Sequence, residues 1–340
     1  MATPAPAKKP SRFGLFLPFV FLLIVAAGWT AWWYIASGRI SQGIDRWIET
    51  QSAQGVDISY GSRQMGGYPF RFELTVDRPV VENQARGTKW EGDRAEFVMQ
   101  AWNLTHMIGR APGHNVVTGS DGIRNSVDLD PHAAFSLSWD KAGLKRFGLQ
   151  SGEAKALLDG QLYDISDLSL NLAPRPETPD NLMIALQWEK IVLEQAPAAA
   201  PYLGTELGPS RLIGEVEGFY PAFDAAGRKL DGVWGELLDR GGAVNVGQVL
   251  LDWGPLDLGA KADIKLAGGR ANGTIDVRLD EAGDLKQAMM DAGMWTQQAQ
   301  MLVGTLELAS RKGGFLPLSV VDNGVFVGPV LLGQLPGSGS

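Results

Sequence analysis

The stretch that decides the fold lies at residues 66–76 and is Gly66-Gly67-Tyr68-Pro69-Phe70-Arg71-Phe72-Glu73-Leu74-Thr75-Val76. From Phe70 onward, apolar residues alternate with polar or charged ones. Successive side chains of a β-strand point to opposite faces of the sheet. The alternation therefore predicts a half-buried strand with one apolar face.

The residues before this strand predict a corner of the chain. Gly66 and Gly67 permit backbone angles that other residues rarely adopt, while Pro69 fixes its own φ and biases Tyr68 toward an extended conformation. Proline is tolerated at the first position of a strand, and the Tyr68–Pro69 bond is a candidate for the minority cis form. We interpret the motif as the corner that sets the register of an early strand, with Arg71 as its candidate for a specific polar contact.

The alternating pattern recurs along the rest of the chain. Further strands are predicted at 56–60, 95–104, 134–139, 162–172, 182–192, 212–219, 243–253, 256–266, 273–279, 303–309, 316–321 and 325–331. The short connections 266–270 and 322–324 are typical of antiparallel hairpins. We therefore expect a mainly β (α+β) fold, in which a large twisted antiparallel sheet or half-barrel occupies residues 56–336 with a few packing helices.

One helix is predicted over residues 284–302, where apolar residues recur along one face. Met290 and Met294 belong to a second apolar set beside that face. Methionine is common on surfaces that accept varied apolar ligands, and it also fills ordinary cores. Both roles are open for these two residues.

Residues 13–35 form a run of 23 residues without a charge. About 20 apolar residues suffice for a helix to cross the hydrocarbon core of a bilayer. Lys8, Lys9 and Arg12 precede the run and only Arg39 follows soon after it, so residues 1–12 are expected to be a cytoplasmic tail. We expect a single-pass inner-membrane protein whose remaining chain is periplasmic.

The far end of this run is rich in aromatic residues. Trp29, Trp32, Trp33 and Tyr34 are expected at the membrane interface, where amphipathic rings settle. They also favour an uncleaved anchor over the alternative, a signal peptide cleaved after Ala27. Residues 36–55 are predicted to form an amphipathic stalk helix that packs on the domain or lies along the membrane surface.

Composition excludes several classes of function. The chain contains no cysteine, which excludes disulfides and cysteine-based metal sites. Residues 1–36 carry three basic and no acidic side chains, so the exported part has a net charge of -11 against -8 for the whole chain. Such an acidic body is a poor match for nucleic acid or for anionic lipid headgroups.

Sequence motifs for catalysis, metals and cofactors were not found. His106, His114 and His132 fit no zinc template, and we interpret them as loop or surface residues. Asp121, Asp128 and Asp130 lack the calcium-loop spacing and are interpreted as turn residues. No nucleophile elbow, phosphate-binding loop or dinucleotide fingerprint occurs in a suitable setting. We predict no catalytic residue, no metal and no cofactor.

Several segments behind one N-terminal span carry a family resemblance. They are residues 66–71, Asp252-Trp253-Gly254-Pro255-Leu256, Asn323-Gly324, Val327-Gly328-Pro329 and Leu335-Pro336. In this order they resemble the bacterial envelope family called domain of unknown function 2125, over residues 13–336. The resemblance carries no activity to transfer. It implies a distant similarity to AsmA-like periplasmic proteins, whose long antiparallel sheets can hold lipid acyl chains.

Two functional hypotheses follow. In the first, the sheet binds lipid or another apolar ligand through Phe70, Phe72, Leu74, Met290 and Met294, in lipid transport or homeostasis of the envelope. In the second, the domain has a filled core and is a scaffold for an envelope protein partner. Neither hypothesis fixes an oligomeric state, and residues 337–340 are predicted to be a disordered tail.

Overall fold

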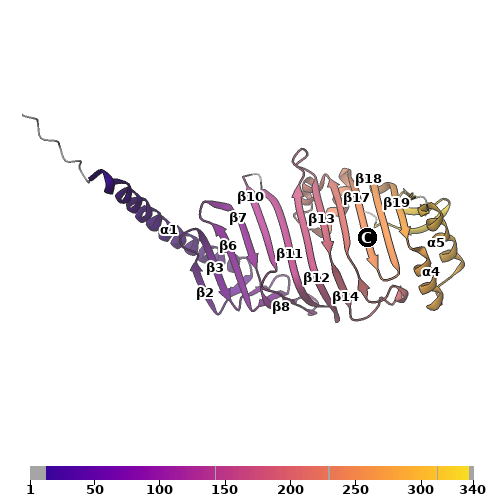
Figure 1. Ribbon diagram of the computed structural model, residues 1–340, viewed down its shortest axis with the longest axis horizontal. Coiled ribbons are helices and arrows are strands. Elements are labelled where there is room, and N and C mark those ends of the chain that lie inside the picture. Colours follow the sequence, from indigo (N-terminus) through magenta and orange to yellow (C-terminus); the bar gives the residue numbers. More distant parts are fainter. Residues whose placement is uncertain (1–12, 142, 229, 312, 337–340) are drawn as a thin grey trace, which may run out of the picture.

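The computed structural model describes residues 13–141, 143–228, 230–311 and 313–336. The predictions of a cytoplasmic tail at 1–12 and a disordered tail at 337–340 lie outside these residues. Within them, one antiparallel sheet extends from beside helix α1 at one end to helices α4 and α5 at the other (Figure 1). The expected fold class is confirmed.

The helices are α1 (Phe13–Ala53), α2 (Phe219–Ala225), α3 (Leu230–Arg240), α4 (Ala282–Asp291), α5 (Gln297–Ser310) and the short 3-10 helix η1 (Pro201–Leu203). The first strands are β1 (Val56–Ser59), β2 (Ser62–Gly66), β3 (Arg71–Asp77), β4 (Val80–Asn83), β5 (Thr88–Gly92), β6 (Arg94–Gln100), β7 (Asn103–Arg110), β8 (Gly113–Thr118), β9 (Arg124–Leu129), β10 (Ala134–Asp140) and β11 (Gly143–Leu158). The others are β12 (Gln161–Pro174), β13 (Leu182–Trp188), β14 (Lys190–Leu193), β15 (Glu206–Leu207), β16 (Ser210–Glu217), β17 (Gly242–Trp253), β18 (Leu256–Ala267), β19 (Arg270–Asp280), β20 (Leu316–Val321), β21 (Gly324–Val327) and β22 (Val330–Gln334).

Many of these strands are halves of longer ones that meet at an interruption. Arg78 and Pro79 separate β3 from β4, and both halves pair with the neighbouring long strands: β3 with β2 and β6, β4 with β1 and β5. The backbone has a positive φ angle at Arg78, and also at Asp167 inside β12, where the partner strand changes from β14 to β13. Each long strand pairs with the next one along the chain, so the sheet is an open meander.

The register separates the two faces of the sheet by polarity. Directly opposite residues in an antiparallel ladder project to the same face. One cross-strand row is apolar throughout: Met65, Leu74, Phe97, Gly109, Phe135, Leu149, Leu170, Leu186, Leu212, Val249, Ala260, Val277 and Leu316.

A second row is apolar as well and lies two residues away along each strand, except on β17, where a register shift makes the separation three residues. It consists of Phe72, Met99, Met107, Leu137, Phe147, Leu172, Ile184, Gly214, Val246, Ala262, Ile275 and Leu318. We call the face that carries both rows the apolar face. On the opposite face, the corresponding residues of the central strands are polar: Gln150, Ser169, Gln187 and Arg211.

The buried clusters lie at the two ends of the sheet. Near its beginning, Trp33 of α1 packs on Phe72. Near its end, α3 contributes Leu237 and Leu238 to a cluster with Leu266, and α4 and α5 form another with β19. Between these ends the leucines of the apolar rows are half-buried. The helices thus cover both ends of the apolar face and leave its middle without a helical cover among the described residues.

The predicted strand at 303–309 is wrong, since these residues belong to α5. Val303 and Leu306 are three residues apart, and this helical spacing lets both pack into the same cluster. The single helix predicted over 284–302 is two helices. Gly293 has a positive φ, and the Thr296 side chain accepts a hydrogen bond from the Ala299 backbone N–H, so it caps the start of α5.

Sequence patterns missed α2, α3 and the strands β2, β4, β5, β8, β9 and β11. Two predicted strands, 95–104 and 325–331, each contain a turn. Both helices contain residues that are poor helix formers, such as Pro221, Gly232 and Gly235, and these hid the helical period. The strand predicted at 95–104 is two strands, because the chain reverses at Ala101 and Trp102 between β6 and β7. Helix α1 is continuous from the predicted span through the predicted stalk.

The register of the last strands can be tested through a carboxylate row on the polar face. Asp252, Asp257 and Asp280 are opposite one another on β17, β18 and β19. Burial, followed by repulsion from Asp280, Asp252 and Glu281, raises the pKa of Asp257. Because the folded-state pKa lies above the unfolded value of about 4, this group costs stability as pH rises through the folded-state pKa.

We therefore expect Asp257→Asn to raise the midpoint of thermal unfolding at pH 7, with a gain that disappears below about pH 4. The control is Asp263→Asn on the same strand, where both cross-strand neighbours are uncharged. Thermal unfolding across this pH range measures both variants. If the two variants changed the unfolding midpoint equally at each pH, the row of opposite carboxylates would be contradicted.

Candidate functional site

Helix α1 is fixed to the sheet by two tryptophan side chains. Trp29 Nε1 donates a hydrogen bond to the Pro69 carbonyl oxygen at 2.9 Å, and Trp33 Nε1 donates to the Arg71 carbonyl oxygen at 3.0 Å. Among the described residues, α1 is the helix long and apolar enough to cross a membrane. The sequence 66–76 is thus the docking point for α1.

The contact is completed by stacked rings. Trp33 is only 4% exposed and Phe72 only 3%, and their rings are nearly parallel with centroids 5.5 Å apart. Tyr68 stacks on Tyr34 and places its hydroxyl 2.6 Å from the Thr30 hydroxyl. Trp33, which we expected at the membrane interface, is therefore also a buried packing residue. Trp32 and Tyr34 remain exposed.

The glycine-proline corner gives the chain the shape that this contact needs. Gly67 has φ +92°, and its carbonyl accepts a hydrogen bond from the Arg71 backbone N–H. A Cβ at Gly67 would lie 2.6 Å from the Arg71 carbonyl oxygen, the atom that Trp33 binds. The Tyr68–Pro69 peptide bond is cis. The guanidinium of Arg71 pairs with Glu73, so the contact specific to α1 uses its backbone instead.

A groove of about 490 Å³ lies between the helix and this corner. We call it the junction groove. Its two walls are Leu22, Val25, Ala26 and Trp29 on α1, and Tyr68, Pro69, Phe70 and Trp102 on the sheet. Phe70 and Trp102 are 64% and 63% exposed and meet edge to face. Trp102 was missed from the sequence, although a tryptophan in a two-residue turn between strands is a usable signal.

The other residues predicted to bind ligand are distributed over the whole molecule. Leu74 lies in the first apolar row, on β3, the strand that begins at the corner, whereas Phe72 is covered by Trp33. Met290 on α4 is exposed and Met294 follows that helix, at the far end of the sheet (Figure 1). Phe70 and the methionines therefore do not form one site.

The apolar face connects the two ends of the molecule. Its longer row crosses 13 strands, from Met65 beside α1 to Leu316 beside α5. With neighbouring strands about 4.8 Å apart, the path is roughly 60 Å long. In its middle, Leu149, Leu170 and Leu186 are half-buried. Apolar surface of this extent, with polar residues on the other side, is the feature that a lipid-like ligand requires.

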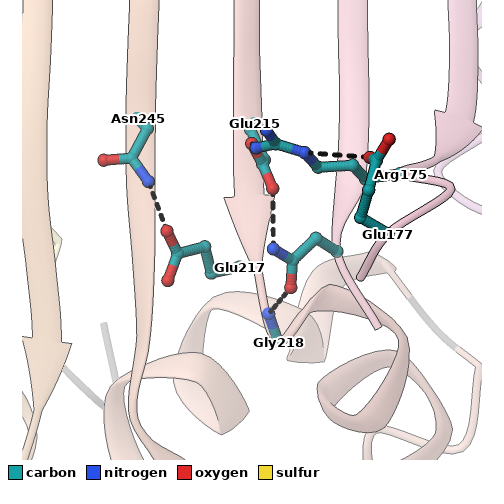
Figure 2. Close-up of polar contacts among 7 residues, drawn as sticks. Arg175, Glu177, Glu215, Glu217, Gly218 and Asn245 are labelled. Atoms are coloured by element: carbon teal, nitrogen blue, oxygen red, sulfur yellow. Dashed lines mark hydrogen bonds and ion pairs between the residues drawn. The ribbon is translucent and has the colours of Figure 1, made fainter. Parts of the chain in front are cut away.

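A polar network marks the point where helices begin to cover the apolar face (Figure 2). Glu215 accepts hydrogen bonds from Arg175 at 2.5 Å and from Asn181 at 2.6 Å. The Asn181 side chain in turn accepts a hydrogen bond from the backbone N–H of Gly218, where α2 begins. The network thereby ties the β12–β13 loop to the start of α2, and so fixes the helical cover of the sheet.

The polar residues considered as metal ligands make local contacts. His106 is hydrogen-bonded to Ser136, and His114 to Asp128. Asp121 and Asp130 accept hydrogen bonds from backbone N–H groups two residues ahead, as turn-forming aspartates do. Asp128 lies in β9, opposite His114 of β8, so its interpretation as a turn residue is wrong. In the part of the chain that the structure describes, no group of three or more histidines and carboxylates could hold a metal ion.

The contribution of Trp33 can be measured against an exposed tryptophan of the same helix. We expect Trp33→Ala to lower the free energy of unfolding by about 3 kcal/mol, because it removes a buried ring. Trp47 is 55% exposed, so Trp47→Ala should change it by less than about 0.5 kcal/mol. Unfolding of the full chain in detergent gives both values, and similar losses would contradict the docked arrangement.

The two glycines of the corner provide a second matched pair. Gly67→Ala should destabilise the protein by about 1–3 kcal/mol, because alanine is strained at this φ angle and its Cβ meets the Arg71 carbonyl. Gly66 has open space around it, so Gly66→Ala should be neutral or slightly stabilising. Denaturant unfolding of both variants tests this. A larger loss of unfolding free energy for Gly66→Ala than for Gly67→Ala would contradict the described conformation of the corner.

Comparison with known proteins places this architecture in a family. No curated protein and no solved structure matches the chain. The model of a family described as "Uncharacterized protein conserved in bacteria (DUF2125)" matches residues 32–336, which include the docking tryptophan Trp33, the glycine-proline corner and the entire sheet. This protein therefore belongs to that family of uncharacterised bacterial proteins.

Proposed function

We propose that this protein is an inner-membrane-anchored periplasmic protein that binds the acyl chains of lipid on the apolar face of its sheet. The observation that carries the proposal is the pair of apolar rows, which cross 12 and 13 strands without a polar residue. The bilayer contact is assigned to residues 13–35, and the basic residues before them favour a cytoplasmic N-terminus.

The energetics of the sheet support a ligand on its middle part. Transfer of apolar surface from water is favourable by about 25 cal/mol per Å², so half-exposed leucines on adjacent strands gain from an apolar partner. Helices supply that partner at both ends of the sheet but do not cover Leu149, Leu170 and Leu186. An acyl chain is long, flexible and apolar, and would lie across the strands along such a row.

The proposal needs no chemical step. Binding and movement of a lipid along an apolar row require dispersion contacts and exclusion of water, and the residues described here supply both. The acidic body of the protein also agrees with recognition of the acyl chains in preference to anionic headgroups. A role in lipid transport or lipid homeostasis of the envelope would follow from such binding.

Lipid that co-purifies with the full chain is the direct test. Native mass spectrometry of the protein released from mild detergent should show bound phospholipid. Leu170→Lys places a charge on the apolar face and should reduce the bound lipid at least about tenfold, because a buried unpaired charge is costly. The matched control is Asn171→Lys, one residue away on the polar face of the same strand, which should retain it.

Circular dichroism of both variants checks that the sheet is intact. If the wild type carries no lipid under these conditions, or if Leu170→Lys and Asn171→Lys bind equally, lipid binding on the apolar face is wrong.

A second candidate function is a scaffold for an envelope protein partner. It is favoured by β22, which is paired only with β21 among the described strands and exposes Leu331 and Leu332. An open edge strand can accept a strand of another protein. A photo-crosslinking residue at position 332 in intact cells would then give one dominant protein adduct, whereas the same residue at position 170 would give no lipid adduct.

A further inference from the structure

The junction groove has the properties of a lipid site built into the anchor itself. One wall consists of Leu22, Val25, Ala26 and Trp29, all within the expected membrane span. Polar groups of the lining residues are already hydrogen-bonded. The Trp29 N–H donates to the Pro69 carbonyl, and the Tyr68 hydroxyl is hydrogen-bonded to the Thr30 hydroxyl. A groove with satisfied polar groups and apolar walls can be filled by hydrocarbon at no polar cost.

Its depth follows from the helix. Leu22 precedes Trp29 by seven residues, and a rise of 1.5 Å per residue puts it about 10 Å further toward the membrane centre. Aromatic rings such as Trp32 and Tyr34, which are exposed here, settle at the headgroup level. The groove therefore begins at the interface and extends into the acyl region, where the surrounding molecules are lipids.

We propose that the junction groove binds one acyl chain of a periplasmic-leaflet phospholipid, and that Phe70 and Trp102 insert into the bilayer beside α1. The inference rests on the proposed function, which sets the orientation of the protein in the membrane. A volume of about 490 Å³ lies within the range of about 300–1,000 Å³ of small-ligand sites. Exposure of 64% for Phe70 and 63% for Trp102 is unfavourable in water and favourable in a membrane.

The position of the groove also assigns it a role. The Phe70 carbonyl accepts a hydrogen bond from Ala101, and Phe72 and Leu74 continue the same alternating set into the two apolar rows. Because α1 is hydrogen-bonded to the corner, the groove stays in fixed contact with the beginning of the apolar face. An acyl chain held in the groove is thus next to β3, where Phe72 is covered by Trp33 and the half-buried Leu74 is the first residue of the rows open to a ligand. The groove is the entry point for lipid from the bilayer.

The test uses the full chain in vesicles of phosphatidylethanolamine and phosphatidylglycerol that contain phosphatidylethanolamine with a diazirine on one acyl chain. After illumination, mass spectrometry should find adducts on peptides that contain residues 22–29, Phe70 or Trp102. Ala26→Trp fills the groove and should reduce these adducts at least about tenfold. Ala27→Trp is the control, because Ala27 does not line the groove, and it should leave them unchanged.

A second measurement reports depth and does not depend on the filling variant. The chain has no cysteine, so Trp102→Cys and Val117→Cys each give a single nitroxide label. Val117 is exposed on β8, which continues the long strand of β7 away from the junction. Electron paramagnetic resonance accessibility should place the label at 102 in the hydrocarbon region and the label at 117 in water.

The proposal is overturned if the label at 102 is in water, or if Ala26→Trp and Ala27→Trp give equal groove adducts. Failure of the proposed function looks different. In that case groove adducts persist and depend on Ala26, while peptides that contain Leu149 and Leu170 carry none. If the wild type gives no groove adducts but keeps adducts at Leu149 and Leu170, the groove site is overturned and the proposed function stands.

Discussion

The pleat of the antiparallel sheet is the constraint on which this structure depends. Side chains alternate between faces with a period of two, so a slip of one residue in any strand would move its leucines to the polar face. The observed register keeps Leu149, Leu170 and Leu186 opposite one another, while Gln150, Ser169 and Gln187 occupy the other face. Interruptions such as Arg78–Pro79 divide the long strands, yet each half stays paired with the corresponding halves of its neighbours. One apolar surface therefore runs from the anchor helix to the terminal helices.

The anchor is held to this surface by a compact contact. Two indole N–H groups bind backbone carbonyls of the glycine-proline corner, and Trp33 covers Phe72. The charge pair between Asp45 and Arg63 adds a second tie, between α1 and β2. The sheet thus keeps a fixed position relative to α1, and the apolar rows begin near the end of the span expected within that helix. A lipid that moves from α1 onto the sheet would therefore pass directly from one apolar surface to another.

Sequence patterns predicted part of the sheet, because alternation is a local signal, but they missed β2, β4, β5, β8, β9 and the long strand β11. Alternation at residues 70–76 and at 243–279 identified strands, and the glycine corner was placed at the start of β3. The association of Trp33 with Phe72 could not be predicted, since the two residues are 39 positions apart and tryptophans at the end of a span are explained equally well by the membrane interface. The strand predicted at 303–309 is wrong for a different reason. A short apolar run is compatible with the period of a strand and with that of a helix until its tertiary partners are known. Phe70 and the methionines at 290 and 294 were grouped by chemistry, whereas their separation depends on the order of the strands.

The central claim is that the apolar face carries lipid. A cryo-electron microscopy map of the full chain in a lipid nanodisc would test it most directly. Our account predicts elongated, non-protein density along the apolar rows over Leu149, Leu170 and Leu186, on the opposite side from Gln150 and Gln187. A map in which these leucines are covered by the protein itself, or are bare with no such density, would contradict it.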